Sequence, residues 1–201
     1  MQLDSPPVLQ ALNESRVFVI THKVFLKLLR PQLTQERQPV IENIGRLLST
    51  TPPFPFSGKV VEAKHTLFDL TPCGNEYEQT FARFLDAATD VKAFANLGNL
   101  PQKLSIEYLD GEANLRYYEP DFIARDTKGT HWLLETKGRE DPDVVFKNTR
   151  AEKWCEDVSA LTSEQWNFQI IKQKDFQQIN PRTLADLTSA LSAGGVLFTE
   201  V

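Results

Sequence analysis

The chain has 201 residues, of which 41% are hydrophobic and 24% charged, a composition typical of a water-soluble protein with one good core and a smaller second unit. No run approaches the roughly 20 apolar residues of a membrane span, and the N-terminus lacks a basic-then-apolar signal, so we expect a cytoplasmic protein. Cys73 and Cys155 are the only cysteines, too few for a disulfide framework or a four-ligand zinc site.

The first 58 residues predict a small helical unit. The expected elements are an extended arm over Met1–Ser15, a short strand over Arg16–Ile20, and helices over His22–Arg30 and Pro39–Leu48. The first helix has an apolar face with Phe25, Leu28 and Leu29, and a basic row of Lys23, Lys27 and Arg30. That row could contact a nucleic acid, or it could be an ordinary solvated face.

A boundary is predicted at residues 51–58, which read TPPFPFSG. Three prolines exclude a helix or a central strand there. We therefore expect an N-terminal unit over residues 1–58 and a second domain over residues 59–201. Lys59–Leu70 alternates loosely and predicts a strand leading into that domain.

A helix is predicted to begin at Asn75. Asn75 suits the N-cap position and Glu78 follows three residues later, the arrangement of a capping box. The inward stripe of this helix would be Glu78, Phe81, Ala82 and Leu85. An acid therefore stands at the head of an apolar stripe.

Two hairpins are predicted next. The first joins Leu104–Leu109 to Leu115–Tyr118 through Asp110-Gly111, and Pro120 then predicts a bulge or a partner-free position. The second joins Phe122–Arg125 to His131–Glu135 through a loop centred on Lys128.

The register of the second hairpin brings acids together. A loop closed symmetrically about Lys128 pairs Ile123 with Leu133, and so places Asp121 opposite Glu135. Cross-strand neighbours hold their Cβ atoms about 4.5–5.5 Å apart, and like charges so placed repel. Lys137 shares a strand face with Glu135, about 6.6 Å further along. Two acids and a lysine therefore converge.

This set suits phosphodiester hydrolysis with Mg²⁺. Mg²⁺ takes oxygen ligands and is commonly held by one or two carboxylates with water and substrate phosphate. It polarises the phosphoryl oxygen and acidifies a bound water, and Lys137 could orient that water or offset charge on the phosphate. The alternative is a surface hairpin with an exposed Glu–Lys pair, worth less than about 1 kcal/mol.

The remaining chain predicts a helix from an Asp143 cap to about Thr162, a strand over Asn167–Lys172 and a helix over Pro181–Leu191. The buried stripe of the first of these helices would be Ala151, Trp154, Cys155, Val158 and Leu161, with Lys147 extending it toward the helix start. This order predicts an α/β fold with a mixed central sheet flanked by helices, and a small helical N-terminal unit packed on it.

The motifs resemble a known family. Pro120-Asp121 followed by Glu135-Thr136-Lys137 is similar to the PD-(D/E)xK nuclease signature. The stretch from Asn75 to about Val158 resembles the C-terminal endonuclease domain of type III restriction enzyme Res subunits, through the blocks NEYEQTFARFLD, YYEPDFIARD, LLETKGRED and AEKWCEDV. The resemblance implies a restriction-endonuclease-like fold and Mg²⁺-dependent cleavage of double-stranded DNA.

The resemblance also implies roles for individual residues. Asp121 and Glu135 would be metal ligands, the Thr136 carbonyl a third ligand, and Lys137 the catalytic lysine. Many nucleases of this fold carry a further carboxylate on the first helix, and Glu78 is the position that resembles it, although its cap explains it equally well. Independently of the resemblance, a helix that follows the catalytic strand commonly brings its N-terminal turn near the end of that strand, so Arg139, Lys147 and Arg150 could contact DNA phosphates; they could equally be ordinary surface charges.

Charge and a missing motif bear on partners. Residues 71–201 hold 14 basic and 21 acidic residues, a poor balance for gripping DNA unaided. No G-x-x-x-x-G-K-[ST] phosphate loop occurs, whereas Res subunits carry a helicase motor. We therefore expect a separate helicase/ATPase motor and a modification subunit as partners. The alternatives are a non-catalytic DNA-binding or docking module on a nuclease fold, and an RNA or single-strand nuclease.

Overall fold

A computed structural model describes residues 6–13, 15–33, 38–41, 47–101, 103–138 and 144–195. Its helices are α1 (Pro6–Leu12), α2 (Ser15–Leu33), α3 (Glu76–Ala87), α4 (Val144–Thr162), α5 (Gln173–Ile179) and α6 (Leu184–Gly195), with a short 3-10 turn at Leu48–Thr50. Its strands are β1 (Lys59–Glu62), β2 (Leu70–Cys73), β3 (Val91–Asn96), β4 (Ile106–Leu109), β5 (Leu115–Tyr118), β6 (Phe122–Asp126), β7 (His131–Lys137) and β8 (Trp166–Lys172).

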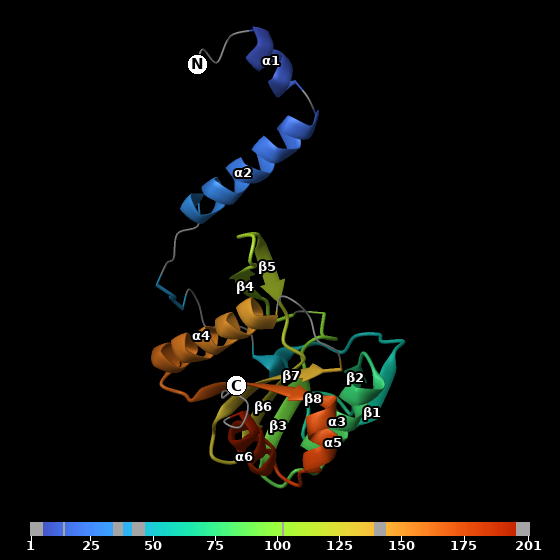
Figure 1. The fold of residues 1–201 in the computed structure, drawn as a ribbon. Coiled ribbons are helices and arrows are strands. Elements are labelled where there is room, and N and C mark those ends of the chain that lie inside the picture. Colours follow the sequence, from blue (N-terminus) through green and yellow to red (C-terminus); the bar gives the residue numbers. More distant parts are fainter. Residues whose placement is uncertain are drawn as a thin grey trace.

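The centre of the fold is a four-stranded mixed sheet in the order β3-β6-β7-β8 (Figure 1). β3 pairs with β6 and β6 pairs with β7 in antiparallel orientation, whereas β8 is parallel to β7. The pairs β1-β2 and β4-β5 form separate two-stranded sheets. The predicted mixed sheet with flanking helices is thus confirmed, as is a small helical segment at the N-terminus.

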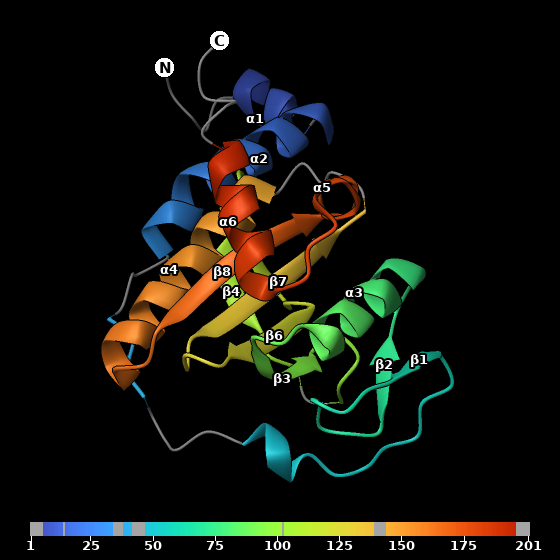
Figure 2. The ribbon, with the colours of Figure 1, turned by 90° about the horizontal axis from the view of Figure 1, so that it is seen from below.

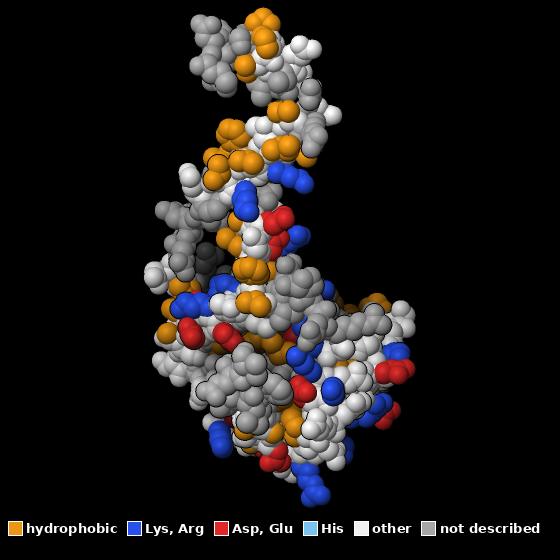
Figure 3. Space-filling view, in the orientation of Figure 1, with side chains coloured by type: hydrophobic (Ala, Val, Ile, Leu, Met, Phe, Trp, Pro, Cys, Tyr) orange, Lys and Arg blue, Asp and Glu red, His pale blue; other side chains and the backbone are white. Residues whose placement is uncertain are grey.

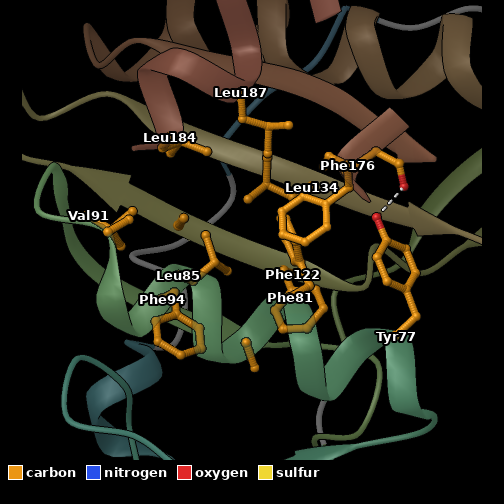
Figure 4. Packing of buried hydrophobic residues seen from close by; sticks show 14 of the residues in the cluster. Tyr77, Phe81, Leu85, Val91, Phe94, Phe122, Leu134, Phe176, Leu184 and Leu187 are labelled. Carbon is orange, nitrogen blue, oxygen red and sulfur yellow. Dashed lines mark hydrogen bonds between the residues drawn. The ribbon is translucent and has the colours of Figure 1, made fainter. Parts of the chain in front are cut away.

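Helices cover both faces of the central sheet (Figure 2). One core lies between the sheet and the helices α3, α5 and α6, where Phe81 touches Phe122 and Phe176 edge-on at ring distances of 5.3 and 5.6 Å (Figure 4). The other core lies under α4 and the β4-β5 hairpin, around Leu133 and Ala151. The alternation of each strand decides the face, so neighbouring residues such as Leu133 and Leu134 enter different cores.

The N-terminal predictions were partly wrong. Pro6 and Pro7 start α1, because prolines are tolerated in a first helical turn where N–H groups lack partners. The expected strand at Arg16–Ile20 is part of α2, since apolar residues at helical spacing continue over 19 residues and outweigh a short β-branched run. Pro31 removes one main-chain donor near the end of α2, which runs on to Leu33.

The helix predicted over Pro39–Leu48 is not formed where the chain is described. Residues 38–41 and 47 have no regular structure, and residues 42–46 lie outside the described part. The N-terminal unit was expected to pack on the α/β fold, but the helix α2 stands away from the central sheet, and hydrophobic side chains are visible along it (Figures 1 and 3). Phe25 and Leu28, on the predicted apolar face of this helix, are 59% and 63% exposed.

The boundary at residues 51–58 has no helix or strand, as predicted. Phe54 packs edge-on against Phe68 at a ring distance of 5.7 Å, which ties this segment to the loop between β1 and β2. The strand predicted over Lys59–Leu70 is instead the antiparallel pair of β1 and β2. The chain turns between them, where the N–H groups of Lys64 and His65 donate to the Asp86 carboxylate at 2.7 and 2.8 Å.

Four further elements, β3, α4, α5 and α6, differ from the predictions. The strand β3 and the helix α5 were not predicted: β3 contains Ala93 and Ala95, which have low strand propensity. The helix α6 begins at Leu184, because Thr183 caps it by accepting the N–H of Asp186 at 3.0 Å. Leu161, expected in the buried stripe of α4, is 42% exposed because it lies in the last turn of that helix.

Candidate metal-binding and catalytic site

The hairpin of β6 and β7 has the predicted register. Ile123 pairs with Leu133, and Arg125 with His131. Asp121 lies directly before β6, and Pro120, expected at a bulge or a partner-free position, lies outside the strand pairs. Its carbonyl accepts the N–H groups of Leu97 and Gly98 at 2.6 and 3.4 Å, which fixes this residue at the end of β3. Extending the register by one pair beyond Phe122 brings Asp121 beside Glu135.

Asp121 is a largely buried carboxylate with one engaged oxygen. Its Oδ2 accepts the main-chain N–H of Thr136 at 2.8 Å and the Thr136 hydroxyl at 2.6 Å. Burial, and then the nearby Glu135 charge, raise the pKa of Asp121 to about 6 in spite of these bonds. Among the described residues no donor reaches Oδ1, and the neighbouring Gly98 has no side chain to cover it: a Cβ there would lie 3.9 Å away.

Glu135 is buried, with both oxygens in polar contacts. Its Oε1 accepts from the Lys147 ammonium at 2.5 Å and lies 3.6 Å from the Lys137 ammonium. Its Oε2 accepts the Tyr118 hydroxyl at 2.9 Å. A carboxylate that is only 5% exposed needs such compensation, because leaving a buried charge unpaired costs several kcal/mol.

The two lysines come from different elements. Lys137 ends β7, as the sequence predicted, and its side chain is 16% exposed. Lys147 lies in the first turn of α4, with its ammonium 4.4 Å from the centre of the Tyr118 ring as well as on Glu135. Sequence reasoning placed Lys147 toward substrate phosphate; in this structure it is turned to the carboxylate instead. Its contact with DNA stays a prediction.

The two arginines predicted to contact DNA differ in what the structure describes. Arg150 donates to the Glu107 carbonyl at 3.1 Å and lies 3.8 Å from an Asp157 oxygen, so it is engaged within the fold. Arg139 lies outside the described residues. Contact with DNA stays a prediction for both arginines.

Glu78 has the buried position at the head of α3 that its stripe predicted. Its oxygens accept from the Gly74 N–H at 2.7 Å and from the side-chain amides of Asn75, Asn96 and Asn99 at 2.6, 3.0 and 3.3 Å. Its charge also contributes to the raised pKa of Asp121, so it lies close to the pair. These four bonds show Glu78 as a cap and a network centre; a catalytic role stays a prediction.

The cap at Asn75 supports a stability prediction. The Asn75 carbonyl oxygen accepts the Glu78 N–H at 2.9 Å. Asn75→Ala should lower the free energy of unfolding by about 1 kcal/mol, the usual cost of a lost N-cap. Urea denaturation measures this. Asn75→Ser retains a cap oxygen and should lose much less, so equal losses for both variants would contradict the capping role.

Sequence reasoning missed Tyr118, Asn96 and Asn99. Tyr118 was expected only as the end of a hairpin strand, and the two asparagines lie in and after the unpredicted β3. Their contacts join segments 17 to 21 residues apart in the chain. Strand alternation can indicate which side chain is buried, but it does not indicate which acid that side chain meets.

The residues present fit Mg²⁺. No group of three or more His, Cys, Asp or Glu side chains in the described ranges is arranged to hold a metal. Mg²⁺ does not require one, because it is commonly bound through one or two carboxylates, water and substrate phosphate. Asp121 and Glu135 supply two carboxylates, and Oδ1 of Asp121 remains for a cation. An open hollow of about 450 Å³ lies beside the end of β7, where Thr136, Gly138, Tyr77 and Gln173 are among its lining residues.

No helix among the described residues is long and apolar enough to cross a membrane. Comparison with known proteins finds no match: no family model, no curated protein and no solved structure resembles the chain closely enough to be reported.

Proposed function

We propose that this chain is an Mg²⁺-dependent nuclease domain that hydrolyses phosphodiester bonds in double-stranded DNA. The observation that supports it most is the meeting of Asp121, directly before β6, with Glu135 of the adjacent strand β7, together with a raised Asp121 pKa and the Lys137 ammonium 3.6 Å from Glu135. Perturbed acids next to a lysine are typical of functional sites. The central mixed sheet lies between helices, and its β6-β7 hairpin positions the two acids. This arrangement supports both the proposed restriction-endonuclease-like fold and the proposed nuclease motif.

The residues have distinct roles in this proposal. Asp121 and Glu135 hold the cation, with the Thr136 carbonyl as a further ligand. When bound, Mg²⁺ supplies Lewis-acid polarisation of the phosphoryl oxygen and a water of lowered pKa. Lys137 places its ammonium beside the attacked phosphate, where it orients the water and offsets the charge that develops. Thr136 keeps Asp121 in position through its two hydrogen bonds.

The partners follow from the resemblance and the charge. Residues 71–201 have an excess of seven acidic residues, and the basic residues nearest the pair are engaged with acids or carbonyls of the chain itself. We therefore propose that a helicase/ATPase motor, together with a modification subunit, delivers the DNA.

This charge distribution predicts weak DNA binding by the chain alone. The slope of log K against log salt should be shallow and correspond to no more than about three neutralised phosphates. A fluorescence titration of a labelled duplex at several salt concentrations measures the slope. Tight binding with a steep slope would show that no delivering partner is needed.

The direct test is incubation of purified protein with supercoiled plasmid in Mg²⁺ or EDTA, with and without a candidate motor protein. The proposal predicts nicked or linear products only with Mg²⁺, and more of them with the motor. No cleavage in any arm would contradict it. Parallel reactions with RNA and single-stranded DNA show whether the protein is instead a nuclease that acts on RNA or on single strands.

One observation favours a second candidate, a non-catalytic docking module on the same fold. Both oxygens of Glu135 already have partners within the protein. In such a module the acids and lysines would be a structural network, and Mg²⁺ would neither bind nor stabilise the protein.

A further inference from the structure

Lys147 occupies Oε1 of Glu135, one of the two oxygens through which this carboxylate could bind a cation. Its ammonium lies 2.5 Å from Oε1, whereas the Lys137 ammonium lies 3.6 Å from the same atom. The Lys147 side chain is only 14% exposed, and the Tyr118 ring packs against it at 4.4 Å. The shorter contact with Glu135 is therefore made by the lysine from α4, and not by the lysine of the strand motif.

This contact balances charge when no cation is present. Both ammonium groups, Lys137 and Lys147, lie on the Glu135 carboxylate, and the Asp121 charge lies beside it. A divalent cation on Oε1 would lie within a few ångströms of the Lys147 ammonium, and like charges at such distances repel by kilocalories even at the effective dielectric of a partly buried site. A divalent cation and the Lys147 ammonium therefore cannot both contact Oε1 while Lys147 keeps its present position.

We propose that Lys147 is a positioning residue that holds Glu135 in the metal-free protein and withdraws from Oε1 when a divalent cation binds. This inference rests on the proposed function, and it adds that Lys147 and the divalent cation compete for Glu135. Holding a buried carboxylate with an internal cation keeps the site ordered and lowers its affinity for metal. Withdrawal frees an ammonium in the first turn of α4, on the same side of the sheet as the acids.

Mn²⁺ binding tests the competition without any measurement of cleavage. Mn²⁺ takes the same oxygen ligands, and its free concentration is read by electron paramagnetic resonance. Lys147→Met should bind Mn²⁺ at least about tenfold more tightly than the wild type, within the range usual for coupled sites. Lys153→Met removes the same charge from the exposed side of α4, where it pairs with Asp157 at 2.9 Å, and should change the affinity less than twofold.

The outcomes separate this inference from the proposed function. If Asp121→Asn loses Mn²⁺ binding but Lys147→Met binds no more tightly than the wild type, the metal site stands and the competition is wrong. If Asp121→Asn, Lys147→Met and wild type bind Mn²⁺ equally weakly, the metal site itself is wrong, and the competition with it.

A second measurement uses the wild-type chain, in case Lys147→Met folds poorly. Acetylation by acetic anhydride, quantified by peptide mass spectrometry, reports how accessible each ammonium is. Lys147 should be several-fold more reactive in Mg²⁺ than in EDTA, while the reactivity of Lys153 stays constant. Equal protection of Lys147 in both conditions would overturn the proposal.

Discussion

Asp121→Asn is expected to make the protein more stable than wild type in EDTA while abolishing cleavage. The pKa of Asp121 is raised from its ordinary 3.8 to about 6, so its charged form costs the folded state free energy at neutral pH. The asparagine carbonyl can still accept from Thr136, and its amide can donate toward Glu135. After allowance for partial exposure, we expect a gain of about 1–3 kcal/mol in the free energy of unfolding.

The raised pKa of Asp121 determines how the stability gain of Asp121→Asn depends on pH. The folded pKa lies above the unfolded one, so the folded state binds the proton more tightly. The penalty from charged Asp121 is therefore absent below about pH 4, grows as the pH rises toward 6, and is complete above that. Urea unfolding in EDTA at pH 4, 5, 6 and 7 should show the stability difference between variant and wild type growing across this window.

Asp126→Asn is the matched control on the same hairpin. Partial burial alone would raise the pKa of Asp126, but hydrogen bonds from Thr130, Trp132 and Lys128 lower it below its usual range. Its charge therefore stabilises the fold above its ordinary pKa, and Asp126→Asn should be less stable than wild type at pH 7. A loss of stability in both variants would show that Asp121 is not strained by its neighbour.

Lys137→Ala should leave the fold intact and lower cleavage by at least about 10²-fold, the usual loss for one positioned electrostatic or proton-transfer group. Stability should change little, because Glu135 keeps Lys147 and Tyr118 as partners. Initial rates of plasmid cleavage and a melting curve of the same sample measure both. Lys128→Ala, in the exposed turn of the same hairpin, is the control and should cleave like wild type. Unchanged cleavage by Lys137→Ala would remove this lysine from the site.

Local patterns were sufficient to predict the hairpin of the site. The alternation on either side of a polar turn set the register, and the pairs Ile123–Leu133 and Arg125–His131 are found as predicted. The N-cap and the buried stripe of α3 were also predictable. Apolar residues at helical spacing indicate a buried face, and an Asn followed three residues later by Glu indicates a capping box.

The contacts around the site were not readable from sequence. Lys147 was assigned to the correct face of α4, yet its partner Glu135 is 12 residues away on another element, and no periodicity encodes that meeting. The site contacts of Tyr118 and Asn96 depend on the position of the β4-β5 hairpin and on the position of β3 at the edge of the central sheet, neither of which the sequence pattern indicates. In the N-terminal segment, the β-branched run at Arg16–Ile20 misled because local strand propensity is weak against longer helical periodicity.

The central claim is that Asp121 and Glu135 together bind Mg²⁺. A melting series from zero to millimolar Mg²⁺ tests it most directly, because a ligand that binds only the folded state stabilises it in proportion to its occupancy. The wild type should melt at progressively higher temperature with saturation, and Asp121→Asn, more stable in EDTA, should gain little, so that the two curves converge. Equal shifts for both proteins, or no shift for either, would contradict a metal site built on this pair.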